Sequence, residues 1–304
     1  MLDRLTLDQL RILVAVAETG SFSAAARRLG RVQSAISQSV QSLEDVLQVQ
    51  LFARAGKTPT LTEAGAALLE DARYLIRGAE TLRARAQSMA EDVEPELTLA
   101  IDSMFPSAVL MESLRGLSRE FPNLPVTVFT EGLGGPEQRL RDGVVRLAIC
   151  TLLLAYESFE TEFLTSLPAV AVVAADHPLA QEPQPLTRDQ LEPHVQLVLT
   201  DRTPLSQSLR GGIFSRRIWR FADLQTRLDY LLAGFGWCNM PLHLVEAHIK
   251  TGRLKLLALK EISGFEFRMQ IVYPRGRPPR RAGQWLIGDL RRRISDPKYA
   301  NYRF

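Results

Sequence analysis

Neutral polar side chains recur at helical spacing between residues 33 and 42. Serine and glutamine both donate and accept hydrogen bonds, and glutamine can form two bonds to an adenine edge in the major groove. A solvated helix face normally carries lysine and glutamate, and a carboxylate in this place would repel phosphates. The pattern therefore predicts a helix that contacts base edges through Gln33, Ser34, Ser37, Gln38, Gln41 and Ser42.

Two shorter helices are expected to position this face. Gly20 ends the first, Ser21 can cap the second, and Gly30 supplies the turn before a third helix that begins near Gln33. Helix, glycine turn and polar-faced helix together predict a helix-turn-helix; a polar helix pair in an ordinary bundle is the alternative. The buried faces are expected to be Leu7, Leu10, Leu13, Val14 and Ala17; Phe22, Ala25, Ala26 and Leu29; and Ile36, Val40, Leu43 and Leu47. We also place Ser21 and Ser23 among the candidate DNA contacts.

A basic hairpin follows the third helix. Two short strands, Leu51-Phe52 and Thr60-Leu61, flank a Gly/Pro-bearing tip, which is typical of a wing. Arg54 and Lys57 in that tip would contact phosphates or the minor groove and supply the salt-sensitive part of the affinity.

The sequence offers little for catalysis. It has no Gly-x-Ser-x-Gly elbow, no phosphate loop and no histidine pair at metal-ligand spacing, so we predict no catalytic residues, no metal, no cofactor and no enzyme. The four histidines are His177, His194, His243 and His248. An enzyme on the α/β portion is thus the competing hypothesis that these absences disfavour. A redox sensor using Cys150 and Cys238 is a third possibility, and it requires their Cα atoms to come within about 7 Å.

Length and composition limit the class of protein and the number of domains. The 304 residues suffice for two or more domains, and 46% hydrophobic with 23% charged residues indicates a folded, soluble protein. A net charge of +3 would not by itself identify a nucleic-acid binder. The first residues do not resemble a signal peptide and the apolar runs are too short to span a bilayer, so we expect a cytoplasmic protein without a membrane partner.

A long helix is expected between Thr62, which can cap it, and about Ala90. Its leucines repeat every seven residues and leave a narrow apolar seam that suits a second copy of the helix, so we predict a homodimer; packing against its own domain is the alternative. The seam consists of Leu68, Leu75, Leu82 and Met89. An acidic stretch from Glu91 to Glu96, broken by Pro95, marks the domain boundary.

Beyond Pro95 strands and helices alternate, which predicts α/β subdomains. The expected strands are 97–101, 126–130, 147–150, 169–174, 195–200 and 269–273, with helices at 105–121 and 222–233. From Arg275 onwards nine basic residues face two aspartates, which fits the solvated face of a C-terminal helix.

Hydroxyl side chains stand at several of these strand ends. Ligands of open α/β sheets gather there, beside helix N-termini that favour an anionic or carbonyl-bearing molecule, so we expect a small effector such as a carboxylate. The candidates are Ser103, Thr130, Thr151 and Thr200, for each of which helix capping is the alternative.

An ordered set of segments resembles the LysR-type regulators over about the first sixty residues. The segments are Leu10 to Val16, Gly20 to Ala26, Gln33 to Gln38, Leu43-Glu44, Leu51 to Arg54 and Leu61 to Gly65. Two positions depart from the usual pattern: Gln38 replaces a frequent arginine, and Ala53 replaces an acidic residue before Arg54. Both bear on the DNA sequence that is recognised.

The resemblance implies an α+β multidomain protein. It would have a winged helix-turn-helix at 1–61, a linker helix at 62–91 through which the protein dimerises, and a two-lobed α/β effector domain at 92–304 resembling periplasmic binding proteins. The lobes would be about 97–166 plus 269–304, and about 167–268. The segment Gly234 to Pro241 looks like a family loop near the cleft, which makes Cys238 an effector-site candidate, although its aromatics could equally fill the core.

The function implied is sequence-specific transcription regulation controlled by a small effector bound between the lobes. A dimer, or a dimer of dimers, would bind a roughly palindromic double-stranded site with half-sites about one helical turn or a multiple of it apart. RNA polymerase is a further partner to expect of such a regulator.

Overall fold

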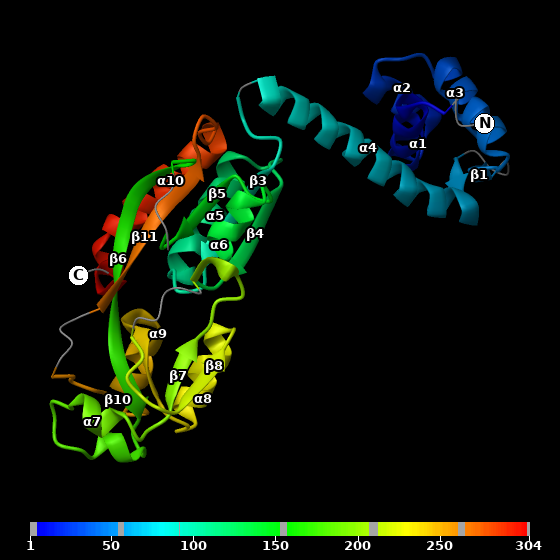
Figure 1. Cartoon of the computed structure of the whole chain (residues 1–304). Helices are drawn as coiled ribbons and strands as arrows, with labels where there is room; N and C mark the ends of the chain where they lie inside the picture. Colours follow the sequence, from blue (N-terminus) through cyan, green and yellow to red (C-terminus); the bar gives the residue numbers. More distant parts are fainter. Residues whose placement is uncertain are drawn as a thin grey trace. The chain divides into compact units, whose positions relative to one another are not determined.

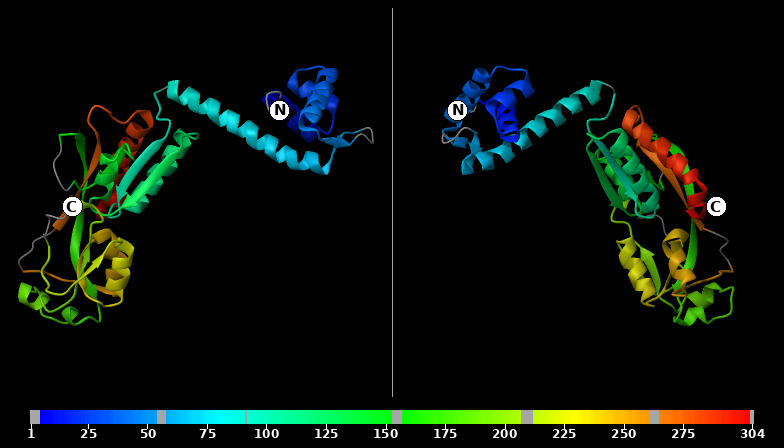
Figure 2. Two further views of the ribbon diagram at one scale, coloured as in Figure 1. Left: turned by 45° about the vertical axis from the view of Figure 1, so that its right-hand side comes forward. Right: turned by 180° about the vertical axis from the view of Figure 1, so that it is seen from behind.

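A computed structural model describes residues 5–53, 58–90, 92–152, 157–206, 212–260 and 265–302. The chain divides into two compact units, Met1–Gln87 and Ser88–Phe304. Within the described ranges, no helix is both long enough and apolar enough to cross a membrane. The α+β class expected from the sequence is confirmed, and the two units are described separately below (Figures 1 and 2).

The first unit begins with the three expected helices, α1 (Leu7–Thr19), α2 (Phe22–Leu29) and α3 (Gln33–Leu47). Gly20 and Gly30 end α1 and α2 in the left-handed conformation, with φ of 64° and 66°, which glycine adopts without steric cost. The Ser21 hydroxyl accepts a hydrogen bond from the Ala24 N–H and caps α2. Buried or partly buried apolar side chains from all three helices form one core, which confirms the predicted faces except at Leu7. Leu7, the first residue of α1, is 41% exposed and was wrongly placed on the buried face.

The wing strands β1 (Phe52–Ala53) and β2 (Thr60–Leu61) pair antiparallel, with Phe52 opposite Leu61. The Glu44 carboxylate at the end of α3 accepts hydrogen bonds from the N–H groups of Leu51 and Phe52, and so fixes where the hairpin starts. Thr62 caps the long helix α4 (Glu63–Ala90) by accepting a bond from the Gly65 N–H at 2.9 Å, as expected.

The second unit contains a sheet with the strand order β4-β3-β5-β11-β6-β9-β7-β8, and β10 pairs with β6. We call the β4, β3, β5 and β11 half lobe I. Its helices α5 and α10 cover one sheet face, with Leu99 and Ile101 beneath them, and α6 covers the other, over Ala100. The elements are β3 (Leu97–Asp102), α5 (Ser107–Glu120), β4 (Val126–Glu131), α6 (Gly135–Arg141), β5 (Leu147–Cys150), β11 (Phe265–Pro274) and α10 (Arg281–Ser295), followed by the short turn Pro297–Tyr302.

We call the other half, with β9, β7, β8 and β10, lobe II. Its parallel pairs β7/β8 and β7/β9 are joined to β6 through the antiparallel β9. The elements are α7 (Arg188–Leu191), β7 (Gln196–Leu199), β8 (Ile218–Phe221), α8 (Leu224–Leu232), β9 (Trp237–Pro241), α9 (Leu242–Lys250) and β10 (Leu254–Leu256), with short turns at Pro178–Ala180 and Pro204–Ser206.

Strand β6 (Phe159–Ala174) runs through both lobes (Figure 1). It pairs with β11 along lobe I and with β9 and β10 in lobe II. The sequence predicted only 169–174, because the first part of the strand alternates between half-buried and exposed residues while its last part is continuously apolar. The prediction of a loop at Gly234 to Pro241 is also wrong beyond Gly236, since β9 begins at Trp237.

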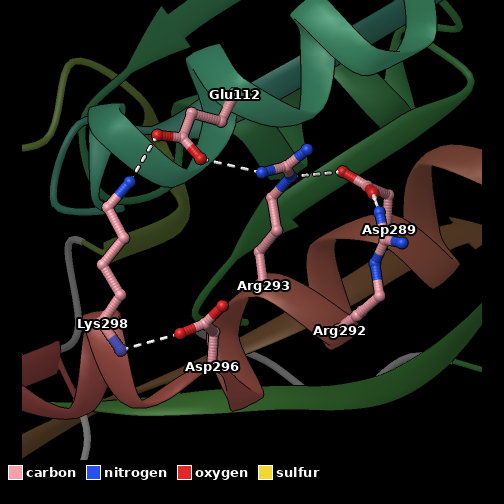
Figure 3. A network of polar contacts seen from close by, with 6 residues as sticks. All are labelled: Glu112, Asp289, Arg292, Arg293, Asp296 and Lys298. Atoms are coloured by element: carbon pink, nitrogen blue, oxygen red, sulfur yellow. Dashed lines mark hydrogen bonds and ion pairs between the residues drawn. The ribbon is translucent and has the colours of Figure 1, made fainter.

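A chain of ion pairs fastens α10 to α5 (Figure 3). Glu112 of α5 accepts bonds from Arg293 at 2.8 Å and Lys298 at 2.7 Å, and the buried carboxylate of Asp289 binds Arg292 and Arg293. The C-terminal helix is therefore amphipathic: it buries an apolar face that includes Leu286 and Leu290, and presents arginines on the other side.

The segment entering the second unit is held by one carboxylate. Glu94 accepts hydrogen bonds from the N–H groups of Arg280, Ala282 and Gly283 at 2.8 to 3.0 Å, which are otherwise unpaired donors at the start of α10. A negative charge at a helix N-terminus is electrostatically favourable.

Two glycines of α4 provide a matched stability test. A Cβ at Gly65 would overlap the main-chain carbonyl of Leu51, whereas a Cβ at Gly78 would meet no atom within 4 Å. We expect Gly65→Ala to lower the free energy of unfolding of the first unit by about 1–3 kcal/mol. Gly78→Ala should raise it by up to about 1 kcal/mol, because alanine favours the helix. Urea denaturation followed by circular dichroism measures both; equal effects of the two changes would contradict the close approach at Gly65.

Candidate DNA and effector sites

The exposed face of α3 carries the polar side chains predicted from the sequence. Ile36, Val40 and Leu43 are buried on the opposite face, which fixes the rotation of the helix. Of the six predicted polar side chains, the four nearest the N-terminus of α3 are exposed and make no side-chain hydrogen bond to the described residues: Gln33, Ser34, Ser37 and Gln38. Their donors and acceptors are therefore free for an external partner.

The other two polar positions are already engaged within the unit. The Gln41 amide donates to Asp45 at 3.0 Å, and the Ser42 hydroxyl accepts from Gln9 of α1 at 3.2 Å. The start of α3 is also open, because its N-cap residue Val32 is 68% exposed and offers no side-chain cap. Val32 was not predicted from the sequence to lie at this end of the helix face, since an exposed valine gives no polar signal.

Two of the serines assigned to DNA already have local partners. Ser21 caps α2, and the half-buried Ser23 accepts a bond from Arg27 at 3.3 Å. Arg28 and Arg31 are likewise occupied, because they bind Glu18 and Asp8 of α1 at 2.7 and 2.6 Å. Arg54 and Lys57, the predicted wing-tip contacts, lie outside the described residues.

The heptad positions of α4 have different surroundings. Leu68 packs against the core of the first unit beside the buried Leu69, whereas Leu75 and Leu82 are 47% and 70% exposed. Met89 lies at a position whose side chain is outside the description. The first leucine of the predicted seam thus packs within its own unit, and the next two, each about two helical turns further on, are exposed to solvent.

The strand-end hydroxyls of the second unit differ in their environment. The Oγ of Ser103, directly after β3, is buried without a hydrogen-bond partner among the described residues, and Thr200, directly after β7, is partly buried. The Thr151 hydroxyl donates to the Arg268 carbonyl at 3.2 Å. Thr130 is exposed on the edge strand β4, on the face opposite Glu131. Ser103 and Thr200 are therefore the better placed of the four.

The two lobes approach each other beside Ser103, at what we call the lobe junction: Gly132 to Gly134 of lobe I with Leu199 and Asp201 of lobe II. The Asp201 carboxylate accepts a hydrogen bond from the Gly134 N–H at 3.2 Å. The Ser103 hydroxyl and the Leu199 side chain both lie within 4.0 Å of the point where a Cβ on Gly132 would stand. Ser103, which follows β3, thus lies in the same small region as Leu199, the last residue of β7.

Asp102, the last residue of β3, is a buried acid that the sequence analysis did not single out. Its side chain is 1% exposed; Oδ1 accepts a bond from the Met104 N–H, and Oδ2 has no partner among the described residues. Burial raises the pKa of Asp102 to about 7, and the negative charge of Asp201 contributes to the rise. The only sequence signal is an acid that ends an apolar strand.

Cys238, the remaining effector-site candidate, lies within the sheet. It is fully buried in β9 opposite Val172, and burial raises the pKa of its thiol to about 11. The Cys150 thiol is also fully buried, and burial raises its pKa well above the ordinary value. Such thiols form little of the reactive thiolate, which disfavours the redox-sensor hypothesis.

Comparison with known proteins assigns both units. The family model described as "LysR substrate binding domain" matches residues 90–295, more than half of the chain, and "Bacterial regulatory helix-turn-helix protein, lysR family" matches residues 7–66. The chain belongs to the LysR family. This LysR-type protein is accordingly a DNA-binding transcriptional regulator with an effector-binding domain, and its family consists of regulators, not enzymes.

Relatives and solved structures cover nearly the same length. The chain is 32% identical over 268 residues to the "Probable HTH-type transcriptional regulator YhaJ" of Escherichia coli K12, covering 87% of this chain and 90% of that protein. It is 28% identical to the "HTH-type transcriptional regulator AceR" of Acinetobacter baumannii, covering 95% and 98%. The structure of a cysteine mutant of Corynebacterium glutamicum OxyR matches with a TM-score of 0.62 and 24% sequence identity, covering 95% of this chain and 93% of that chain. The structure of a full-length BenM mutant matches with a TM-score of 0.53 and 20% sequence identity, covering 96% of each chain. These two structures support the fold.

The raised pKa of Asp102 makes stability of this LysR-type regulator depend on pH. Unfolding restores the ordinary value of 3.8, so between about pH 4 and 7 the folded protein retains a proton that the unfolded chain has lost. The free energy of unfolding therefore falls by up to about 1.4 kcal/mol per pH unit as the pH rises through this range. An asparagine does not ionise, so Asp102→Asn removes this loss of unfolding free energy. The variant should therefore gain stability relative to the wild type as the pH rises.

Urea denaturation of the whole chain at about pH 5 and about pH 8 measures this gain. Asp189→Asn, on the exposed surface of α7, is the control variant. A stability difference between Asp102→Asn and wild type that is the same at both pH values would show that the Asp102 carboxyl is not desolvated in the folded protein.

Proposed function

We propose that this LysR-type regulator recognises a specific double-stranded DNA site through the exposed N-terminal half of α3, with the wing holding the flanking phosphates. The supporting observation is that Gln33, Ser34, Ser37 and Gln38 are exposed while the same helix is fixed by its buried apolar face. Side chains without intramolecular partners on a rigid helix suit direct contact with base edges. A protein that works on the chromosome in this way would act in the cytoplasm.

A small molecule bound at the lobe junction would control this activity. A ligand that touches Ser103 of lobe I and Thr200 of lobe II bridges the two lobes, and it favours whichever lobe arrangement fits it better. Contacts between subunits would pass that change to the spacing of the DNA-binding helices. Ser103→Ala and Thr200→Val are the variants expected to weaken effector binding without changing the DNA sequence that is recognised.

The dimer would form through Leu75 and Leu82 of α4, with a dimer of dimers as the larger assembly. Two exposed leucines seven residues apart are typical of a helix that pairs with a copy of itself. Two-fold symmetry of the protein then calls for a roughly palindromic operator. RNA polymerase would be a partner at promoters, and the regulator would carry out no chemical reaction of its own.

Base contact and phosphate contact should separate in mutants. Gln38→Ala should cost about 1–3 kcal/mol at one base position and relax the preference there. Lys57→Ala should weaken binding to all sequences alike and lower the salt slope by about one. Selection of sites from random duplexes, followed by titration at several salt concentrations, measures both effects. If single alanine changes at Gln33, Ser34, Ser37 and Gln38 all leave the selected sequence unchanged, α3 does not contact the bases.

Dimerisation of the first unit is tested with a charge placed in the seam. Leu82→Glu would put a carboxylate between two paired helices, at a desolvation cost of several kcal/mol, so the isolated segment 1–91 should become monomeric. Arg77→Glu adds a carboxylate on the opposite, exposed face of α4 and should leave the dimer intact. Sedimentation equilibrium measures the mass. A dimer that persists in Leu82→Glu would exclude this seam.

A further inference from the structure

Asp102, next to Ser103 and beside the lobe junction, is an acid whose charge is not balanced by the described residues around it. Asp102 is 1% exposed, and its Oδ2 has no hydrogen-bond partner among the described residues. The neighbouring Ser103 Oγ is also buried and unpartnered within that part of the chain. Burying polar atoms without partners is costly, so two adjacent cases at a lobe contact call for an external partner.

The charged groups around Asp102 leave a negative surplus. Glu131 of β4 pairs with Arg139 of α6 at 2.5 Å, and Glu137 pairs with Arg141 at 3.0 Å. Both arginines of α6 are therefore matched by other acids. Asp201 adds a second carboxylate from lobe II, and within the described ranges it accepts hydrogen bonds from the N–H groups of Gly134 and Thr203. Cys150 of β5, a further titratable neighbour, is a buried thiol.

We propose that the effector of this regulator is an organic cation with N–H donors, such as a primary ammonium compound, that donates a hydrogen bond to Asp102 Oδ2 and contacts the Ser103 hydroxyl. The inference rests on the proposed effector site at the lobe junction and names the chemical class that the site takes. It replaces the carboxylate expected from strand-end hydroxyls, because a carboxylate there would face Asp102 and Asp201 and be repelled by both.

The cation would bind most tightly where Asp102 is ionised. Burial raises the pKa of Asp102 to about 7 in the free protein, so at lower pH the carboxyl must lose a proton before it can pair with an ammonium group. The affinity should therefore fall on the order of tenfold per pH unit below about pH 7 and level off above it. This profile is a readout that does not depend on any variant folding correctly.

The test uses a matched panel of small probes on the full-length protein. Primary alkylammonium ions from ethyl to octyl are each compared with the alcohol and the carboxylate of the same chain length, by thermal shift and calorimetry. At least one ammonium ion should bind on the order of tenfold or more tightly than both counterparts, and Asp102→Asn should remove that advantage. Asp189→Asn, with an exposed acid on α7, should keep it.

The possible results separate this inference from the proposed effector site. If no ammonium ion binds better than its counterparts, or if its advantage persists in Asp102→Asn or is independent of pH, the cation assignment is overturned. A carboxylate or alcohol whose binding is weakened by Ser103→Ala and Thr200→Val would overturn the cation and leave the effector site standing. Ammonium binding that requires Asp102 but leaves DNA binding unchanged would support the cation and count against control of transcription through this site.

Discussion

The arrangement of the effector domain depends on β6 being a single strand of 16 residues shared by both lobes. The main chain of β6 is paired with β11 along lobe I and with β9 and β10 in lobe II. One apolar cluster also continues from Leu99 in lobe I to Met240 in lobe II. The lobes therefore cannot separate as independent bodies. A ligand between them can change their relative angle only by bending this shared strand and β11, which favours small, defined movements over large openings.

The first unit was predictable because its signals are local. Gly20, Ser21, Gly30 and Thr62 each stop or start a helix through their own backbone conformation or side-chain hydrogen bond, and all four act as expected. The exposed polar face of α3 follows from the periodicity of its buried residues. The packing of Leu68 against its own unit could not be predicted in the same way. A leucine at heptad spacing has the same sequence pattern whether it packs on its own core or on a partner helix.

The second unit was less predictable because pairing between distant residues decides it. The first half of β6 is a strand only because β11, a hundred residues later, supplies its hydrogen bonds, and β9 is a strand because it lies between β6 and β7. In the sequence, Asp102 has the position of an ordinary polar residue ending a strand. Its burial arises from the elements packed around it, and no local pattern carries that information.

The ion pairs between α1 and the helices that follow have a bearing on how the regulator finds its operator. Arg28 and Arg31, whose guanidinium groups bind Glu18 and Asp8, contribute less to the attraction that any DNA exerts on a basic surface. A chromosome offers roughly a million or more competing sites, and each weak contact that is indifferent to sequence multiplies over all of them. Pairing these arginines with acids of α1 lowers the net positive charge of this surface, and a lower positive charge reduces the affinity that is indifferent to sequence more than it reduces base contact.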